Sequence, residues 1–154
     1  MLRNKPDISV IVCCHNGGFI YDFVDSVKRS VGANYEIIVV SSYDKLTKIG
    51  IPRCTVIGGP AMPAAKRNLG AKIAKGKYLA FFDDDVEIEP ECLAKFKNAM
   101  DITSAGMLFG KLHKADDPTR FDEAGGYLTP TGFIWSRAEQ NIVDTGQFDS
   151  FDPI

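Results

Sequence analysis

Four short and almost wholly apolar segments recur in the first hundred residues, and they constrain the fold more than any other feature. They cover residues 8–14, 36–40, 54–57 and 78–82 and are rich in Val, Ile and Phe. Runs of this length without polar alternation are typical of strands that are covered on both faces, as in a parallel sheet. We therefore expect a central, mostly parallel sheet.

Helical patterns separate the strands. One begins near Phe19, and we expect Gly32 to end it; its apolar face comprises Phe19, Phe23, Val24, Val27 and Val31. A second begins at Pro63 and runs to Gly76, with Ala65, Leu69, Ala71, Ile73 and Ala74 as a small apolar face. A third opens at Pro90, and residues 41–53 read as a loop. Alternation of strands and helices predicts an α/β fold.

The pattern changes after Thr103. Residues 107–109, 125–128 and 132–135 read as short strands separated by turn residues, which predicts a mixed or antiparallel portion. A chain of 154 residues suits one domain. We expect a single domain over residues 1–154, with an α/β part at 1–100 and a mixed β part at 101–154.

Charge and apolar patterning exclude several functional classes. Eighteen Lys and Arg against 20 Asp and Glu give a net charge of −2, so there is no basic footprint for nucleic acid. No apolar run approaches the roughly 20 residues of a membrane span. The four cysteines, Cys13, Cys14, Cys54 and Cys92, lack C-x-x-C spacing and histidine support for zinc. They read as buried thiols of a reducing compartment, which favours a cytoplasmic location, including the inner face of the membrane.

Three adjacent aspartates follow the fourth apolar segment. In a parallel sheet, ligands bind beyond the carboxyl ends of the strands. Alternation along an extended chain would turn Asp83 and Asp85 to one side and Asp84 to the other. Clustered carboxylates repel unless a cation lies among them, and oxygen ligands suit Mg²⁺ or Mn²⁺. A solvated turn in which Asp85 caps the next helix is the structural alternative.

Two further groups of residues point to the same edge of the sheet. Residues 64–70 carry Lys66 and Arg67, and Arg67 can pair with a carboxylate or hold a phosphate. Alone, this segment reads as a surface helix with ordinary basic residues. Cys13, Cys14, His15 and Asn16 end the first strand. Asn16 can cap the next helix or hold the turn, and His15 can stack on a base or be a partly exposed turn residue.

The order of these motifs resembles glycosyltransferase family 2, the inverting family with the Rossmann-like GT-A fold. The matching segments are residues 8–16, 36–40, 66–70 and 76–85, followed by Pro90. The run Asp83–Asp85 corresponds to the D-x-D motif of the family. The triplet and Pro90 are similar to members that build surface polysaccharides, which implies a role in polysaccharide or glycoconjugate synthesis.

The resemblance implies a nucleotide-diphosphate sugar donor and a hydroxyl acceptor on a saccharide, a lipid-linked or another molecule. Asp85 with Asp83 would ligate Mn²⁺ or Mg²⁺ between the two phosphates, which stabilises the departing diphosphate. Asp83 and Asp84 would also hold ribose, metal-bound water or the sugar. The residues from Cys13 to His15 would line the base, and Arg67 would steady the aspartates or the donor.

Two departures from the family pattern stand out. Many members carry a base-binding aspartate after the second strand, where this chain has Ser41 and Ser42. Ser41 or Ser42 could hydrogen-bond the base more weakly, or Asp44 could swing in. The general base that deprotonates the acceptor is, in the family, an acidic residue well beyond the D-x-D motif. Neither Asp149 nor Asp152 has the surrounding pattern. We therefore expect the general base beyond Ile154 and interpret the chain as the donor-binding half of a longer protein, inactive alone.

That interpretation predicts uncovered apolar surface, with Phe148, Phe151 and Trp135 as candidates, and association between copies of the chain. Two other enzyme classes fit less well. A phosphoacceptor receiver domain would carry acidic residues where this chain has Cys14, His15 and Asn16. A sugar nucleotidyltransferase would need a glycine-rich phosphate loop after the first strand. A non-catalytic nucleotide-sugar-binding module is the main alternative to the enzyme.

Overall fold

The computed structural model describes residues 5–138 and 142–149. The chain divides into two compact units, unit 1 (Met1–Ser104) and unit 2 (Ala105–Ile154). Each is described by itself.

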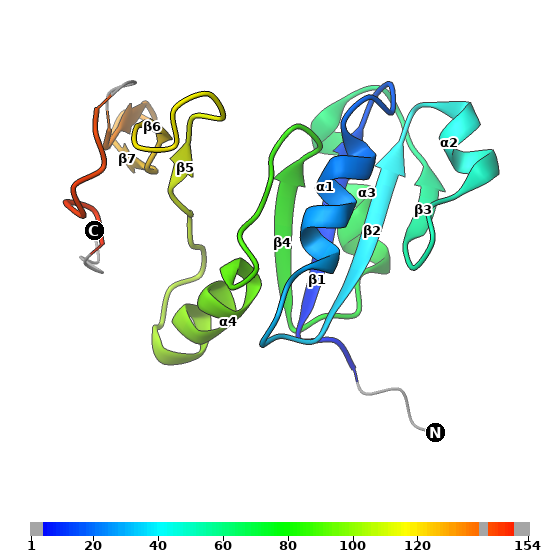
Figure 1. The fold of residues 1–154 in the computed structure, drawn as a ribbon, viewed down its shortest axis with the longest axis horizontal. Coiled ribbons are helices and arrows are strands. Elements are labelled where there is room, and N and C mark those ends of the chain that lie inside the picture. Colours follow the sequence, from blue (N-terminus) through cyan, green and yellow to red (C-terminus); the bar gives the residue numbers. More distant parts are fainter. Residues whose placement is uncertain (1–4, 139–141, 150–154) are drawn as a thin grey trace. The chain divides into compact units, whose positions relative to one another are not determined.

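Unit 1 is built on one parallel sheet (Figure 1). Its strands are β1 (Ile8–Cys14), β2 (Tyr35–Ser41), β3 (Thr55–Gly58) and β4 (Tyr78–Asp83), in the order β3-β2-β1-β4. Cys14 pairs with Ser41 in the β1–β2 ladder, and Cys13 pairs with Asp83 in the β1–β4 ladder. The predicted parallel sheet is confirmed, and the carboxyl ends of β1, β2 and β4 share one edge.

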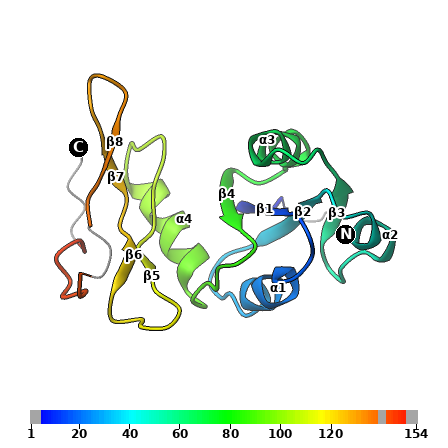
Figure 2. The ribbon, with the colours of Figure 1, turned by 90° about the horizontal axis from the view of Figure 1, so that it is seen from above.

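Helices cover both faces of this sheet. They are α1 (Ile20–Lys28), α2 (Asp44–Ile49), α3 (Pro63–Ile73) and α4 (Cys92–Ile102). Figure 2 shows α1 and α3 on opposite faces. The larger core cluster includes Val10, Val12 and Phe23, and the smaller one lies where α3 packs on Ile11, Ile38 and Val40. Buried apolar side chains on alternate positions of β1 thus supply both layers.

Some predicted details of unit 1 are wrong. The first helix ends at Lys28, before Gly32, so Phe19 and Val31 lie outside it and are exposed. The segment read as a loop contains α2, because Leu46 is buried and gives that short helix an anchor in the core. The helix expected at Pro90 begins two residues later, at Cys92.

A buried serine fastens the opposite, amino edge of the sheet. Ser9 on β1 is fully buried, and its Oγ donates to Glu36 Oε1 at 2.6 Å. The same oxygen accepts from the backbone N–H groups of Gly76 at 2.8 Å and Lys75 at 3.2 Å. A Cβ at Gly76 would lie 2.4 Å from the Ser9 nitrogen. Only glycine therefore allows the turn into β4 to approach β1 so closely.

Unit 2 contains two antiparallel pairs; the second corresponds to the strands predicted at 125–128 and 132–135, and the first was not predicted. Strand β5 (Leu112–His113) pairs with β6 (Phe121–Glu123), and β7 (Gly126–Leu128) pairs with β8 (Ile134–Ser136). The strand expected at 107–109 is absent from this described segment, where Met107 and Phe109 are exposed.

The core of unit 2 is small, and it changes the prediction about uncovered apolar surface. Phe121, Ala124 and Ala138 are buried, and Phe148 packs against them. Phe148 was therefore wrongly predicted to be uncovered, because its ring lies 5.3 Å from that of Phe121. Trp135 is 73% exposed, as predicted, and Phe151 lies outside the described residues.

Charged groups surround this small core. Lys111 Nζ lies 2.7 Å from Asp144 Oδ2 and 2.6 Å from Asp149 Oδ1, and His113 Nε2 lies 2.8 Å from the same Asp144 oxygen. The His113 ring also stacks on Phe121.

The helices of residues 5–138 and 142–149 are all too short or too polar to span a membrane.

Candidate functional site

An ion pair marks the carboxyl end of β4. Arg67, on α3, donates from Nη2 to Oδ1 of Asp83 at 2.6 Å. The side chains are 37% and 62% exposed, so the pair lies at the surface of this edge and stays accessible to a ligand. A guanidinium beside a carboxylate holds the carboxylate in a fixed orientation.

Asp84 lies beside the end of β1. Burial raises the pKa of the Cys14 thiol, and a hydrogen bond with Asp84 raises it further. Strand β4 ends at Asp83, and Asp84 and Asp85 lie in the turn that follows. The exposure of the three side chains alternates, with Asp84 half-buried between two exposed neighbours.

Asp85 is exposed in the turn and forms no hydrogen bond or ion pair with the described residues. The structural alternative for Asp85 was a solvated turn in which it caps the next helix. The exposed turn agrees with this alternative, and the capping is wrong, because the residue at the cap position of α4 is Glu91. An unengaged carboxylate next to the Arg67–Asp83 pair is available to a cation.

The segment after β1 brings His15 to Ser42. His15 Nδ1 and Ser42 Oγ lie 3.3 Å apart, and both side chains follow the ends of adjacent strands. Asn16 holds the turn, since its Oδ1 accepts from the Gly18 N–H at 3.1 Å. It does not cap α1, whose cap position is Phe19.

Ser41 and Asp44 lie after β2, where the resemblance implies a base-binding aspartate. Ser41 is buried, and its Oγ accepts from the Tyr43 N–H at 3.0 Å. Asp44 is the first residue of α2 and is exposed. The sequence reasoning missed Tyr43, whose ring lies so close to Gly17 that a Cβ there would be 3.2 Å from Cδ1. The sequence did offer one signal for Tyr43, an aromatic residue shortly after the end of a strand.

Cys13 and Cys14 are buried, as the strand pattern predicted. Burial raises the pKa of the Cys13 thiol, and the positive charges of Arg67 and Lys66 oppose this rise. Cys13 Sγ also donates to the Pro63 carbonyl at 3.7 Å, where α3 begins. Both thiols are buried at the carboxyl end of β1 and expose little surface to a ligand.

Sequence reasoning also missed Lys66. It was interpreted as part of an ordinary surface helix, but it is 2% exposed. Its Nζ donates to the Cys14 carbonyl oxygen at 2.7 Å. The signal was a lysine among small apolar residues on the helix face that packs on β1.

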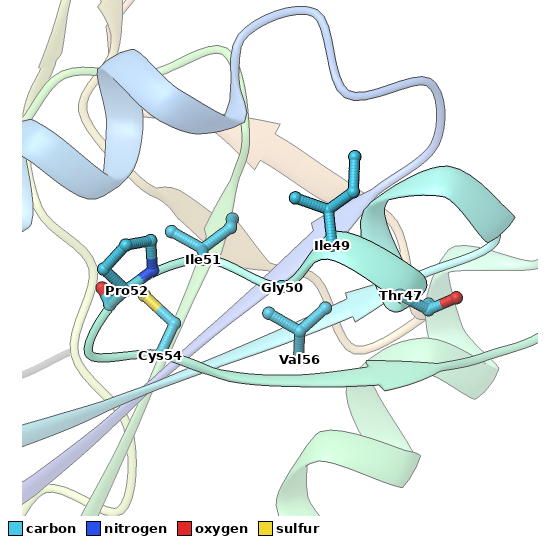
Figure 3. Close-up of a pocket in the computed structure, with 7 residues that line it drawn as sticks. All are labelled: Thr47, Ile49, Gly50, Ile51, Pro52, Cys54 and Val56. Atoms are coloured by element: carbon cyan, nitrogen blue, oxygen red, sulfur yellow. Dashed lines mark hydrogen bonds between the residues drawn. The ribbon is translucent and has the colours of Figure 1, made fainter.

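Two hollows lie elsewhere in unit 1. One is lined by Thr47, Ile49, Gly50, Ile51, Pro52, Cys54 and Val56 (Figure 3). The other is lined by Lys5, Pro6, Asn34, Tyr35, Glu36, Ala74, Lys75 and Gly76. Neither contains a residue predicted for the site, so the candidate site remains the carboxyl edge of β1, β2 and β4.

One protein-family model matches most of the chain. The model for glycosyl transferase family 2 matches residues 9–147. The chain belongs to glycosyl transferase family 2. A search of curated proteins found no match. The predicted resemblance and the GT-A fold are confirmed, and membership of this family implies a nucleotide-sugar donor and an acceptor.

The donor atoms at the edge of this family 2 domain suit a hard cation. Asp83 and Asp85 offer carboxylate oxygens, the ligand type that Mg²⁺ and Mn²⁺ take. Among the described residues, no cluster of three or more His, Cys, Asp or Glu side chains could hold a metal ion.

Proposed function

We propose that this family 2 domain binds a nucleotide-diphosphate sugar at the carboxyl edge of β1, β2 and β4. The bound donor then transfers its sugar, with inversion, to a hydroxyl on a saccharide, a lipid-linked or another acceptor. The main support is the Arg67–Asp83 pair, which lies where Asp84 meets Cys14. Strands β1 and β4 are neighbours at the point where the connections of the sheet change direction, which is where α/β folds bind ligands.

Most of the predicted residues have a place in this proposal. Asp83 and Asp85 would hold Mn²⁺ or Mg²⁺, and Arg67 would keep Asp83 oriented. Asp84 would bind ribose or the sugar. The base would lie over the segment after β1 and β2, where His15 and Ser42 are adjacent. The two buried cysteines would form the floor beneath it.

The chemistry follows from charge. The acceptor oxygen bonds to the anomeric carbon as the bond from that carbon to the diphosphate breaks on the opposite face. The acceptor proton passes to a general base, for which the family uses an acidic residue. When bound, the cation supplies positive charge to the phosphate oxygens of the departing diphosphate. Arg67 contributes a further positive charge beside Asp83.

Calorimetry of nucleoside diphosphates with and without Mn²⁺ tests the proposal. Three aspartates and a diphosphate repel, so each ligand should strengthen the other, by roughly 5–150-fold. Asp85→Ala should abolish this coupling because it removes an unengaged carboxylate. Asp84→Ala should weaken nucleotide binding and keep some metal dependence.

The control is Asp116→Ala, which removes an exposed carboxylate in unit 2 and should leave both affinities unchanged. Tight nucleotide binding without metal, or full coupling in Asp85→Ala, would contradict the assignment of these aspartates. Coupled binding without sugar transfer by the whole natural protein would favour the binding-module alternative.

A further inference from the structure

Lys66 is a charged side chain buried within unit 1. It lies on α3 next to Arg67, is 2% exposed, and donates from Nζ to the carbonyl oxygen of Cys14 at 2.7 Å. Removing an ammonium from water is strongly unfavourable unless opposite charge or hydrogen bonds compensate. The burial of a lysine at this position therefore needs an explanation.

Lys66 has a neutral acceptor and no counter-ion among residues 5–138 and 142–149. It takes part in none of the ion pairs formed by these residues. A carbonyl oxygen occupies one of the three N–H donors of an ammonium. The side chain thus adds an unneutralised positive charge to the interior.

The stem of the side chain is closely packed. A Cβ on Gly59 would lie 3.4 Å from Lys66 Cγ, an ordinary contact distance, and 2.6 Å from Val40 Cγ1, so the glycine segment lies close against Val40 beside the lysine stem. The Gly59 N–H donates to the Ser41 carbonyl at 2.8 Å, which fixes that glycine at the end of β2. The lysine stem is thus held in a packed path.

The ammonium end of the path lies at the candidate site. The Cys14 carbonyl accepts from the Ser42 N–H at 3.3 Å as well as from Lys66, so one oxygen joins α3 to the segments after β1 and β2. The positive charges of Arg67 and Lys66 lower the pKa of the Cys13 thiol, and the negative charges of Asp83 and Asp84 raise it. The buried cation therefore shares its electrostatic environment with the aspartates.

We propose that Lys66 is a positioning residue of the donor site that sets how the site balances an anionic diphosphate against a divalent cation. This inference rests on the proposed donor site. The buried charge offsets part of the negative charge of the three aspartates. Through Cys14, the ammonium also fixes the segment on which the base would lie.

Three substitutions separate charge from tethering. Lys66→Met removes both the charge and the hydrogen bond, Lys66→Gln removes the charge and keeps a donor for the Cys14 carbonyl, and Lys66→Arg keeps the charge. Lys72→Met is the matched control, because Lys72 is an exposed lysine on the same helix. The probes are inorganic pyrophosphate and a panel of uridine, guanosine and thymidine diphosphates, each titrated with and without Mn²⁺ by calorimetry or NMR.

Lys66→Gln and Lys66→Met should weaken metal-free pyrophosphate binding about tenfold, because one fixed positive charge is lost. In the same variants, the factor by which Mn²⁺ strengthens binding should increase, since the site becomes more negative. A purely structural defect would lower both quantities together. Lys66→Arg should restore the wild-type balance, and Lys72→Met should resemble the wild type.

The inference is overturned if folded Lys66→Gln matches the wild type in both quantities, or if the affinity and the Mn²⁺ effect fall together. Wild-type protein that binds pyrophosphate but none of the nucleoside diphosphates would contradict the donor site. The pyrophosphate titrations of the Lys66 variants would then still test the role of Lys66. Wild-type protein that binds neither probe would overturn both proposals. Coupled nucleotide binding that is insensitive to Lys66 would overturn this inference alone.

Discussion

Units 1 and 2 are stabilised by different kinds of contact. In unit 1, strands β1 and β2 are covered on both faces, and side chains such as Val10 and Ile11 are fully buried. The predicted burial of the fourth strand on both faces is wrong, because Leu79 and Phe81 of β4 are each 45% exposed. In unit 2, the strands are two or three residues long, and the core has one large buried side chain, Phe121. Ion pairs around Lys111 and Asp144 add to it. The first unit depends on continuous apolar runs that pair across long stretches of sequence, as Ile8 does with Tyr78, and the second depends on short hairpins and a few ion pairs.

The difference explains where ligand chemistry can arise. Parallel strands leave all their carboxyl ends at one edge, so residues from separate segments meet there. The antiparallel pairs of unit 2 have no common edge of this kind. Three variants, ordered by the size of the expected effect, test whether the two units depend on these contacts independently.

Phe121→Ala should cause the largest loss. Phe121 is fully buried and contacts the rings of His113 and Phe148. Removing such a ring costs about 3–5 kcal/mol of folding free energy. Hydrogen exchange followed by mass spectrometry should show lost protection in peptides of unit 2 and none in unit 1. Phe133→Ala is the control, since Phe133 is 71% exposed. Equal loss in both units would mean that they unfold together.

Gly70→Ala should destabilise unit 1 by about 1–3 kcal/mol, the usual cost of overpacking. A Cβ at Gly70 would lie 2.5 Å from Ile11 Cγ2, where α3 packs on β1. Urea unfolding followed by circular dichroism measures the change. At Gly106, no atom lies within 4 Å of an added Cβ, so Gly106→Ala should change little. Equal effects of the two substitutions would show that α3 does not pack tightly on the sheet.

Asp144→Asn should have the smallest effect and should depend on pH. Hydrogen bonds from Lys111, the Gly146 N–H and His113 lower the pKa of Asp144 below its ordinary value of 3.8. A lowered pKa in the folded state means that the carboxylate stabilises the fold above this ordinary value, and that the stabilisation is lost as the pH falls toward the lowered pKa.

Thermal unfolding at about pH 6 and about pH 3 measures this dependence. The wild type should lose more stability on acidification than Asp144→Asn does. Asp116→Asn removes an exposed carboxylate of the same unit and should keep the wild-type dependence. If Asp144→Asn behaved like this control, the ion pairs of unit 2 would not contribute to its folding.

The sequence predicted what depends on local pattern. The bounds of β1 match the apolar run Ile8–Cys14, and Arg67 pairs with one of the clustered aspartates, as its charge suggested. The depth of Lys66 could not be read from the sequence, because a lysine on a helix is normally solvated and only the packing of α3 on β1 buries it. The turn at Asp84 and the burial of Phe148 likewise depend on tertiary contacts that no local pattern encodes.

The Ser9 contacts have a consequence for engineering the domain. Ser9, Glu36 and the turn at Gly76 join β1, β2 and the entry to β4 at the edge remote from the candidate site. The strands are thus aligned without help from the segments that follow Cys14 and Ser41. Those segments are therefore suitable places to exchange short loops when the donor preference is to be altered, since the alignment of the sheet is secured at the other end.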